Sequence, residues 1–183
     1  MEALSQIKEL SYALDTFYFL VSGALVMWMA AGFAMLEAGL VRAKNTTEIL
    51  TKNVALYAIA CIMYLLFGYQ LMYGAAVNSV IPGLSFLIGA DNPAAAVTGG
   101  GGDAPYYSNL SDFFFQVVFV ATAMSIVSGA VAERMKLWSF LAFAVVMTGV
   151  IYPVQGMWTW GGGWIDAAGY SDFAGSGIVH MAG

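Results

Sequence analysis

The residue best suited to acid–base chemistry in this sequence is its single histidine, His180, which stands in an apolar run near Gly183. An unperturbed imidazole titrates near neutral pH, and ionisable groups inside apolar helices tend to line pathways for ions or protons. Asp172 precedes it at the expected start of the same helix, where a carboxylate can accept unpaired backbone N–H groups. The same charge could also stabilise a cation above that helix.

Three aromatic residues could bind a cation before it reaches the histidine. Phe115 and Phe119 are one helical turn apart and therefore share a helix face. Trp160 lies just beyond the next expected helix, and a tryptophan face attracts cations by about 0.5–2 kcal/mol. Together with His180 they would form a path for a small cation that must lose its charge. Packing alone also explains a phenylalanine pair in most membrane helices.

Other chemistry is less well supported. Ser176 precedes His180 on one helical face, as in a serine hydrolase, but adjacent turns give poor in-line geometry and no oxyanion feature is evident. The glycine-rich run 98–102 lacks the Lys-Ser/Thr of a phosphate cradle and favours a flexible loop. The single cysteine, Cys61, excludes a cysteine-based metal site. We therefore predict no catalytic residue, no metal site and no cofactor.

Composition defines the class of protein. The sequence is 61% hydrophobic and 9% charged, far from the roughly one quarter of charged residues in a soluble domain. It therefore predicts a membrane protein. The net charge of −5 includes no basic run, which makes nucleic acid an unsuitable partner.

Uncharged apolar runs long enough to cross a hydrocarbon core of roughly 30 Å predict the membrane spans. These spans are residues 16–40, 54–73, 113–132 and 137–157, with a fifth helix at 173–183 still running at the end of the sequence. The segment 80–89 is too short to span and is expected to be re-entrant or packed on the surface. Residues 90–110, rich in Ala, Gly and Pro, are expected to form a loop, and Pro153 to bend the last turn of the fourth helix.

Basic residues predict the orientation. Five of the six Lys and Arg residues follow the first and third expected helices: Arg42, Lys44, Lys52, Arg134 and Lys136. Positive charge marks the cytoplasmic side, so the amino terminus and the 158–171 loop are expected outside. Glu37, near the cytoplasmic end of the first helix, is expected to anchor it by reaching the interface or a basic neighbour.

The chain resembles the ammonium transporter family, the Amt/Mep/Rh proteins, over essentially its whole length. The resemblance rests on ordered segments with consistent spacing: AGFAMLEAGLVRAKN at 31–45, FGYQLMYG at 67–74, FFQVVFVATAMSIVSGAVAER at 114–134, and WGGG with DFAGSGIVH at 160–180. The aromatic residues favour the Amt branch. The resemblance to this family implies an all-α polytopic membrane protein. It would contain the first five helices, the fifth incomplete, of an eleven-helix fold made of two inverted halves.

The resemblance also implies roles for individual residues. Phe115 and Phe119 correspond to the phenylalanines that close the outer pore, and Trp160, with Phe119, to the site that recruits external ammonium. Asp172 corresponds to the carboxylate that supports this site. His180 corresponds to the first of two facing pore histidines. The implied function is transport, in which ammonium loses its proton near the phenylalanines and ammonia passes the histidine.

Further expectations follow from the family. They are residence in the cell (inner or plasma) membrane as a multi-pass protein, a homotrimer with one pore per subunit, and a P-II-type signal protein as a possible partner. The second pore histidine and the second half are expected beyond Gly183, so residues 1–183 alone are expected to be inactive. A sensor that uses the same fold without flux is the remaining alternative.

Overall fold

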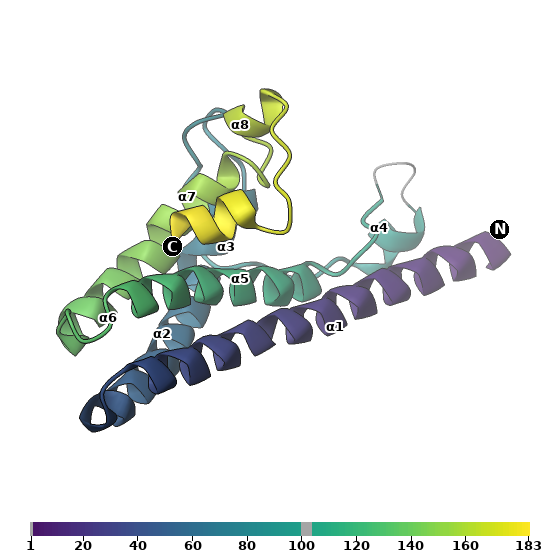
Figure 1. The fold of residues 1–183 in the computed structure, drawn as a ribbon. Coiled ribbons are helices and arrows are strands. Elements are labelled where there is room, and N and C mark those ends of the chain that lie inside the picture. The colour runs from purple at the N-terminus through teal and green to yellow at the C-terminus, as the bar shows by residue number, and fades with distance from the viewer. Residues whose placement is uncertain (1, 100–103) are drawn as a thin grey trace.

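The computed structural model describes residues 2–99 and 104–183, and every regular element in these ranges is a helix (Figure 1). Four helical segments are long and apolar enough to cross a membrane: Ala3–Leu40, Ala43–Tyr73, Asn109–Ala130 and Leu137–Met157. Residues 100–102 of the expected glycine-rich loop lie outside the described residues. The all-α class expected from the sequence is therefore confirmed.

Helix α1 (Glu2–Leu40) begins well before the expected span at Thr16. Its 39 residues extend over about 58 Å, more than the thickness of the hydrocarbon core. The added turns pack on a short helix, α4 (Ala94–Gly99), where the Lys8 Nζ donates to the carbonyl of Thr98 at 3.3 Å. The expectation that 90–110 is entirely loop was therefore wrong, because α4 and the start of α5 lie within it.

Two helices contain a π turn. A short 3₁₀ turn, η1 (Ala43–Asn45), leads into α2 (Thr46–Met63), which continues through the π turn η2 (Tyr64–Gly68) into α3 (Tyr69–Tyr73). Likewise α6 (Leu137–Val146) continues through η3 (Met147–Ile151) into α7 (Tyr152–Met157). A π turn accommodates Pro153 at the start of α7, because proline has no N–H to donate to the preceding turn.

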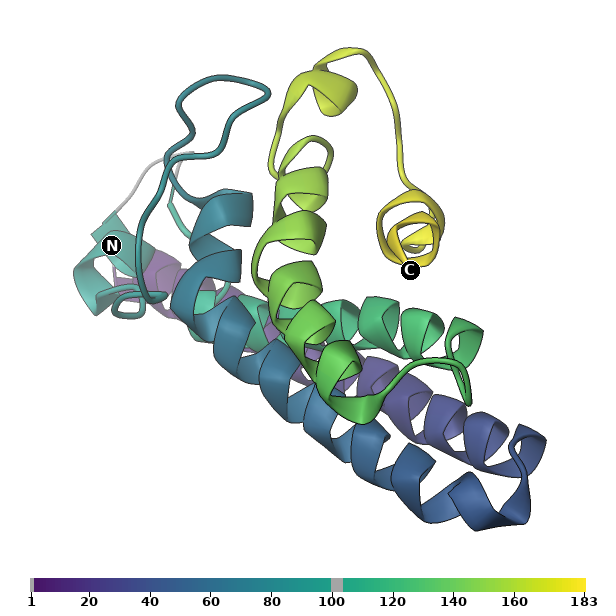
Figure 2. The same cartoon turned by 90° about the vertical axis from the view of Figure 1, so that its left-hand side faces the viewer.

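The π turns η2 and η3 contact each other, so the helices that contain them approach closely where these turns lie. A Cβ on Gly68 would overlap the Tyr64 ring and lie 3.0 Å from Cγ of Pro153. Glycine is therefore required at this crossing for steric reasons. Figure 2 shows α2 and α6 side by side below this level.

Helix α5 (Asn109–Ala130) lies at the centre of the bundle and contacts α1, α2 and the C-terminal π turn η4 (Ser176–His180) (Figures 1 and 2). Ser108 caps its start, because the Ser108 Oγ accepts a hydrogen bond from the Ser111 N–H at 3.3 Å. Val120, Ala121 and Met124 on α5 are completely buried. By contrast, α1 exposes most of its apolar side chains, as expected for a surface that faces lipid.

The C-terminal helical segment begins at Ser176, later than the expected start near Phe173. Ala174 and Gly175 adopt positive φ angles of 52° and 79°, which no α-helix contains. Residues 80–89 form no helix; they lie over the bundle, with the Leu87 N–H donating to the carbonyl of Leu66 at 3.0 Å. The Trp158 indole N–H, next to the short helix α8 (Trp164–Ala167), donates to the carbonyl of Val80 at 2.7 Å.

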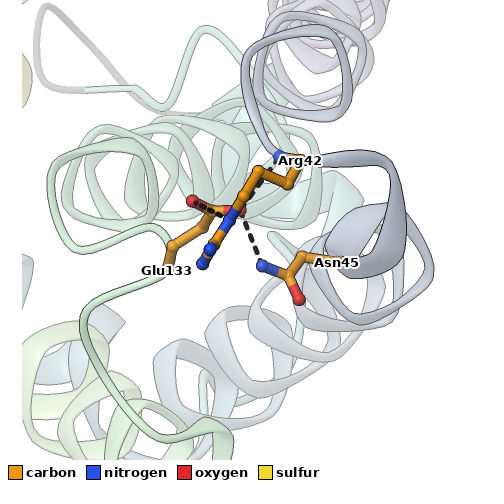
Figure 3. Close-up of polar contacts among 3 residues, drawn as sticks. All are labelled: Arg42, Asn45 and Glu133. Carbon is orange, nitrogen blue, oxygen red and sulfur yellow. Dashed lines mark hydrogen bonds and ion pairs between the residues drawn. The ribbon is translucent and has the colours of Figure 1, made fainter.

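Glu133, just after α5, joins the end of α5 to the turn that follows α1 (Figure 3). Its carboxylate accepts hydrogen bonds from the Asn45 amide at 2.6 Å and from the backbone N–H of Arg42 at 2.9 Å, and pairs with the Arg42 guanidinium at 3.2 Å. These contacts, with the Asn45 hydrogen bond the largest, lower the pKa of Glu133 to about 2. Glu133 itself has a φ of 60°, a strained conformation that these bonds hold in place.

The sequence predicts that Lys52 lies in the loop after the first helix. In the structure it is instead buried in α2. Its Nζ lies 3.5 Å from Oε2 of Glu37 on α1, donates to the carbonyl of Ser128 on α5 at 2.9 Å, and sits 4.8 Å from the centre of the Phe140 ring. Ser128 Oγ also donates to Glu37 Oε2 at 2.7 Å. Glu37 thus contacts a basic neighbour, and this ion pair joins three helices.

Candidate functional site

Helix α5 and the turn after α7 bring together the three aromatic residues selected from the sequence. The rings of Phe115 and Phe119 pack edge to face, with centroids 5.1 Å apart. Trp160 packs on Phe119 in a similar orientation at 5.8 Å. Phe115 also contacts the Phe19 ring of α1 at 5.2 Å. Each of these contacts has the edge-to-face geometry that aromatic pairs prefer.

These rings line one open cavity of about 440 Å³. Tyr73 of α3, Tyr107, and Asp112 and Gln116 of α5 complete its polar wall, and Ala174 and Gly175 also line it. An apolar hollow with a few polar groups is the usual form of a small-molecule site. The arrangement can therefore hold a small cation between aromatic faces and oxygen acceptors.

Asp172 holds the turn beside this cavity. Its carboxylate accepts hydrogen bonds from the backbone N–H groups of Gly175 at 2.8 Å, Gly177 at 2.7 Å and Ile178 at 3.3 Å. A Cβ on Gly175 would lie 3.8 Å from the Trp160 indole, so this turn lies next to that ring. Asp172 and Trp160 also line a neighbouring cavity of about 510 Å³. The carboxylate thus fixes the start of the helical segment against which Trp160 lies.

His180 lies at the end of η4 and is not among the residues that line the aromatic cavity. Its neighbours Ile178 and Val179 are buried, whereas His180 itself is exposed. The described structure therefore does not bring the imidazole together with Phe115, Phe119 and Trp160. It contains no hydrogen bond between Ser176 and His180, which gives a serine hydrolase no geometric support.

Sequence reasoning missed Asp112, Gln116, Tyr73, Tyr107 and Phe19. A signal for two of them was present, because Asp112, Phe115, Gln116 and Phe119 follow the i, i+3, i+4, i+7 spacing of one helix face. The other three come from different elements, and only the fold places them in the cavity. Within residues 2–99 and 104–183, no group of three or more His, Cys, Asp or Glu side chains could hold a metal ion.

The loops around the cavity carry two tyrosines with altered acidity. Burial, followed by the charge of Asp112, raises the pKa of Tyr107 to about 12. Desolvation and then the charge of Asp172 raise the pKa of Tyr170, whose hydroxyl donates to that carboxylate at 3.3 Å. Both phenols stay protonated near neutral pH and remain available as hydrogen-bond partners.

The fold and the cavity define a polytopic helical membrane protein with an aromatic-lined cavity suited to a small cation. The sequence pattern of the Ammonium Transporter Family matches residues 17–183. The chain is 39% identical to ammonium transporter Amt2 of Archaeoglobus fulgidus and 42% identical to ammonium transporter Amt2 of Haloferax mediterranei. These matches cover 100% and 87% of this chain, but 38% and 34% of the two relatives.

Solved structures give the same result. A structure titled "Sensor Amt Protein" superposes with a TM-score of 0.79 at 28% identity, covering 94% of this chain and 42% of that one. A Mep2 mutant from Candida albicans superposes with a TM-score of 0.74 at 25% identity, covering 90% and 36%. The chain belongs to the ammonium transporter family, whose members are transporters rather than enzymes. It spans about two fifths of the length of two of the curated relatives that it matches.

Proposed function

We propose that this chain forms the outer vestibule and the first part of a pathway that transports ammonium across the cell membrane. The observation that carries the proposal is the single cavity in which Trp160, Phe119 and Phe115 lie together, in a chain of the ammonium transporter family. Trp160 and Phe119 would recruit the cation, because aromatic faces attract a desolvated cation by about 0.5–2 kcal/mol.

The phenylalanine pair would then act as the pore gate. A bare ammonium ion loses much of its hydration on passing between apolar rings, and an isolated ion in an apolar medium costs many kcal/mol. Ammonia is neutral and avoids most of that cost. Transfer of one ammonium proton to water near Phe115 and Phe119, and its separate passage along the pore imidazoles, would therefore allow the nitrogen to cross as ammonia.

His180 would be the first pore histidine on the inner side of these rings. Its exposed imidazole, on a segment whose other side packs against the core, leaves it open to a further part of the pathway. An imidazole there has one nitrogen that can donate a hydrogen bond to ammonia and one that can accept. Asp172 would keep the segment in place through its three backbone hydrogen bonds.

The proposed arrangement in the membrane keeps residues 1–183 in one transporter domain with spans at 16–40, 54–73, 113–132 and 137–157, and a fifth segment that begins at Ser176. Arg42, Lys44, Arg134 and Lys136 supply the positive charge that would mark the cytoplasmic end. The Arg42–Glu133 ion pair joins the two loops that carry these residues, which supports their location on one side. The amino terminus would then lie outside. Assembly as a homotrimer and control by a P-II-type signal protein complete the proposal.

Uptake of labelled methylammonium by vesicles that contain the complete gene product tests this function. We expect Trp160→Leu to raise the apparent KM about 2- to 30-fold, which corresponds to loss of 0.5–2 kcal/mol of binding. His180→Ala is expected to lower the maximal rate. Trp164→Leu is the matched control, because Trp164 on α8 lies outside the cavity lining. Equal effects of the two tryptophan substitutions would refute the recruitment role.

A sensor is the second candidate, favoured by the likeness to the solved protein titled "Sensor Amt Protein". A sensor would bind methylammonium in the same cavity without carrying it across the membrane. Saturable binding to the purified protein, combined with no uptake above that of empty vesicles, would favour the sensor over the transporter.

A further inference from the structure

The wall of the aromatic cavity contains a buried carboxylate. Asp112, in the first turn of α5, is the one charged side chain among the residues that line it. The residue is 5% exposed. A charge in such a place requires compensation, because an isolated buried ion costs several kcal/mol.

The compensation that Asp112 receives within the described part of the chain is limited to neutral groups. The Tyr69 hydroxyl donates to Oδ2 at 2.7 Å, and the Gln116 amide donates to Oδ1 at a longer 3.4 Å. Neither of the two ion pairs found among the described residues involves Asp112. The carboxylate therefore keeps acceptor capacity and an unbalanced negative charge at the cavity wall.

A second, independent observation points to a donor in the same place. The Gln116 Oε1 is buried and has no hydrogen-bond partner among the described residues. Buried polar atoms are nearly always satisfied, so an orphan acceptor requires a partner. Gln116 lines the same cavity, one turn along α5 from Asp112. A ligand with several N–H donors would satisfy both side chains.

We propose that Asp112 is a substrate-binding residue, whose carboxylate, with the Gln116 carbonyl oxygen, binds a small ammonium-type cation between the aromatic rings of this cavity. The inference rests on the proposed function, since it assigns a further binding residue to the same site. Aromatic faces supply attraction without direction, whereas the two oxygens accept directed N–H bonds. This combination favours ammonium and methylammonium over alkali cations, which have no N–H to donate.

The competing role for Asp112 is structural, because a carboxylate in a first helical turn also stabilises the helix dipole. Binding of labelled methylammonium to the purified complete gene product separates the two roles, since it requires no flux. We expect Asp112→Asn, which keeps the side-chain shape and an oxygen acceptor for Tyr69, to weaken binding about tenfold or more. Asp112→Glu, which retains the charge, should recover most of the affinity.

Tyr69→Phe is the matched control. It removes the short hydrogen bond to Asp112 but leaves the charge, so binding is expected to stay within about threefold of that of the unsubstituted protein. If Asp112→Asn does not fold, Gln116→Leu takes its place. That substitution removes the orphan acceptor, leaves the Tyr69–Asp112 bond intact, and should weaken binding about threefold or more.

The outcomes distinguish this inference from the proposed function. Normal affinity in a folded Asp112→Asn variant overturns the role of Asp112 even if uptake is normal. Where that variant does not fold, normal affinity in Gln116→Leu overturns the proposed site formed by the two oxygens. Binding that depends on Asp112 in a protein without uptake supports the inference and refutes transport. Absence of methylammonium binding to the unsubstituted protein overturns both.

Discussion

Replacing one member of the buried Glu37–Lys52 pair should destabilise the protein strongly. The two residues are 3% and 6% exposed, and their charged atoms lie 3.5 Å apart. Glu37→Gln would leave the Lys52 ammonium with the Ser128 carbonyl, the Phe140 ring and only the weaker attraction of the Glu48 carboxylate. Leaving an uncompensated buried charge costs about 3–5 kcal/mol.

The expected change is large enough to measure by thermal unfolding of the purified protein in detergent. For a chain of this size, about 3–5 kcal/mol corresponds to a fall in Tm of about 6–20 °C. Lys52→Met should have a similar effect, because it leaves the Glu37 carboxylate buried with a hydrogen bond from Ser128 alone. The double variant Glu37→Gln/Lys52→Met should recover most of the loss, since neither charge remains.

The double-mutant cycle gives the decisive result. Contacting charges should show a coupling of about 0.5–3 kcal/mol or more, whereas independent sites add within about 0.5 kcal/mol. Additive losses, or single variants as stable as the unsubstituted protein, would refute the assignment of this pair as the buried link between α1 and α2.

Three further predictions concern other parts of the bundle. Because the pKa of Glu133 is lowered to about 2 from 4.5, its stabilising contacts are complete above pH 4.5 and are lost as pH falls through about 2. The difference in Tm between the unsubstituted protein and Glu133→Gln should shrink over that window and stay constant above it. Gly68→Ala should destabilise by about 1–3 kcal/mol through overpacking, whereas the control Gly32→Ala, with open space around it, should not. Asp172→Ala should speed amide exchange at Gly177 about 2- to 30-fold, the effect of losing a helix cap worth about 0.5–2 kcal/mol.

The helices themselves could be predicted from apolar runs, and the fourth span begins at Leu137 as expected, but the start of α1 could not be predicted in this way. Charged residues such as Lys8 and Glu9 end an apolar run, yet Lys and Glu are good helix formers, so α1 continues through them. The same reasoning placed Lys52 in a loop. Its counter-charge is on another helix, and a pattern read along one segment does not reveal a partner that the fold supplies.

The aromatic residues of the candidate site could be predicted from the sequence, but its buried carboxylate could not. Spacing along α5 places Phe115 and Phe119 on one face, and the structure adds Trp160 to them. Asp112 was missed because it bounds the apolar run that predicts the helix, and there it looks like an interfacial charge. Its hydrogen-bond donor Tyr69 and the cavity residues Phe19, Tyr73 and Trp160 belong to elements remote in the sequence.

The two carboxylates buried in this bundle are balanced in different ways, and the difference supports a binding role for one of them. Glu37 has an internal cation, because Lys52 on the adjacent helix carries the opposite charge. Asp112 has neutral donors in the described structure, and an open cavity lies beside it. A charge that serves packing is best neutralised from within, since a fixed partner is present in every state of the protein. A charge left to be neutralised by a mobile cation gains that stabilisation when the cation binds. The aromatic cavity therefore has the electrostatic property that the proposed ammonium site requires.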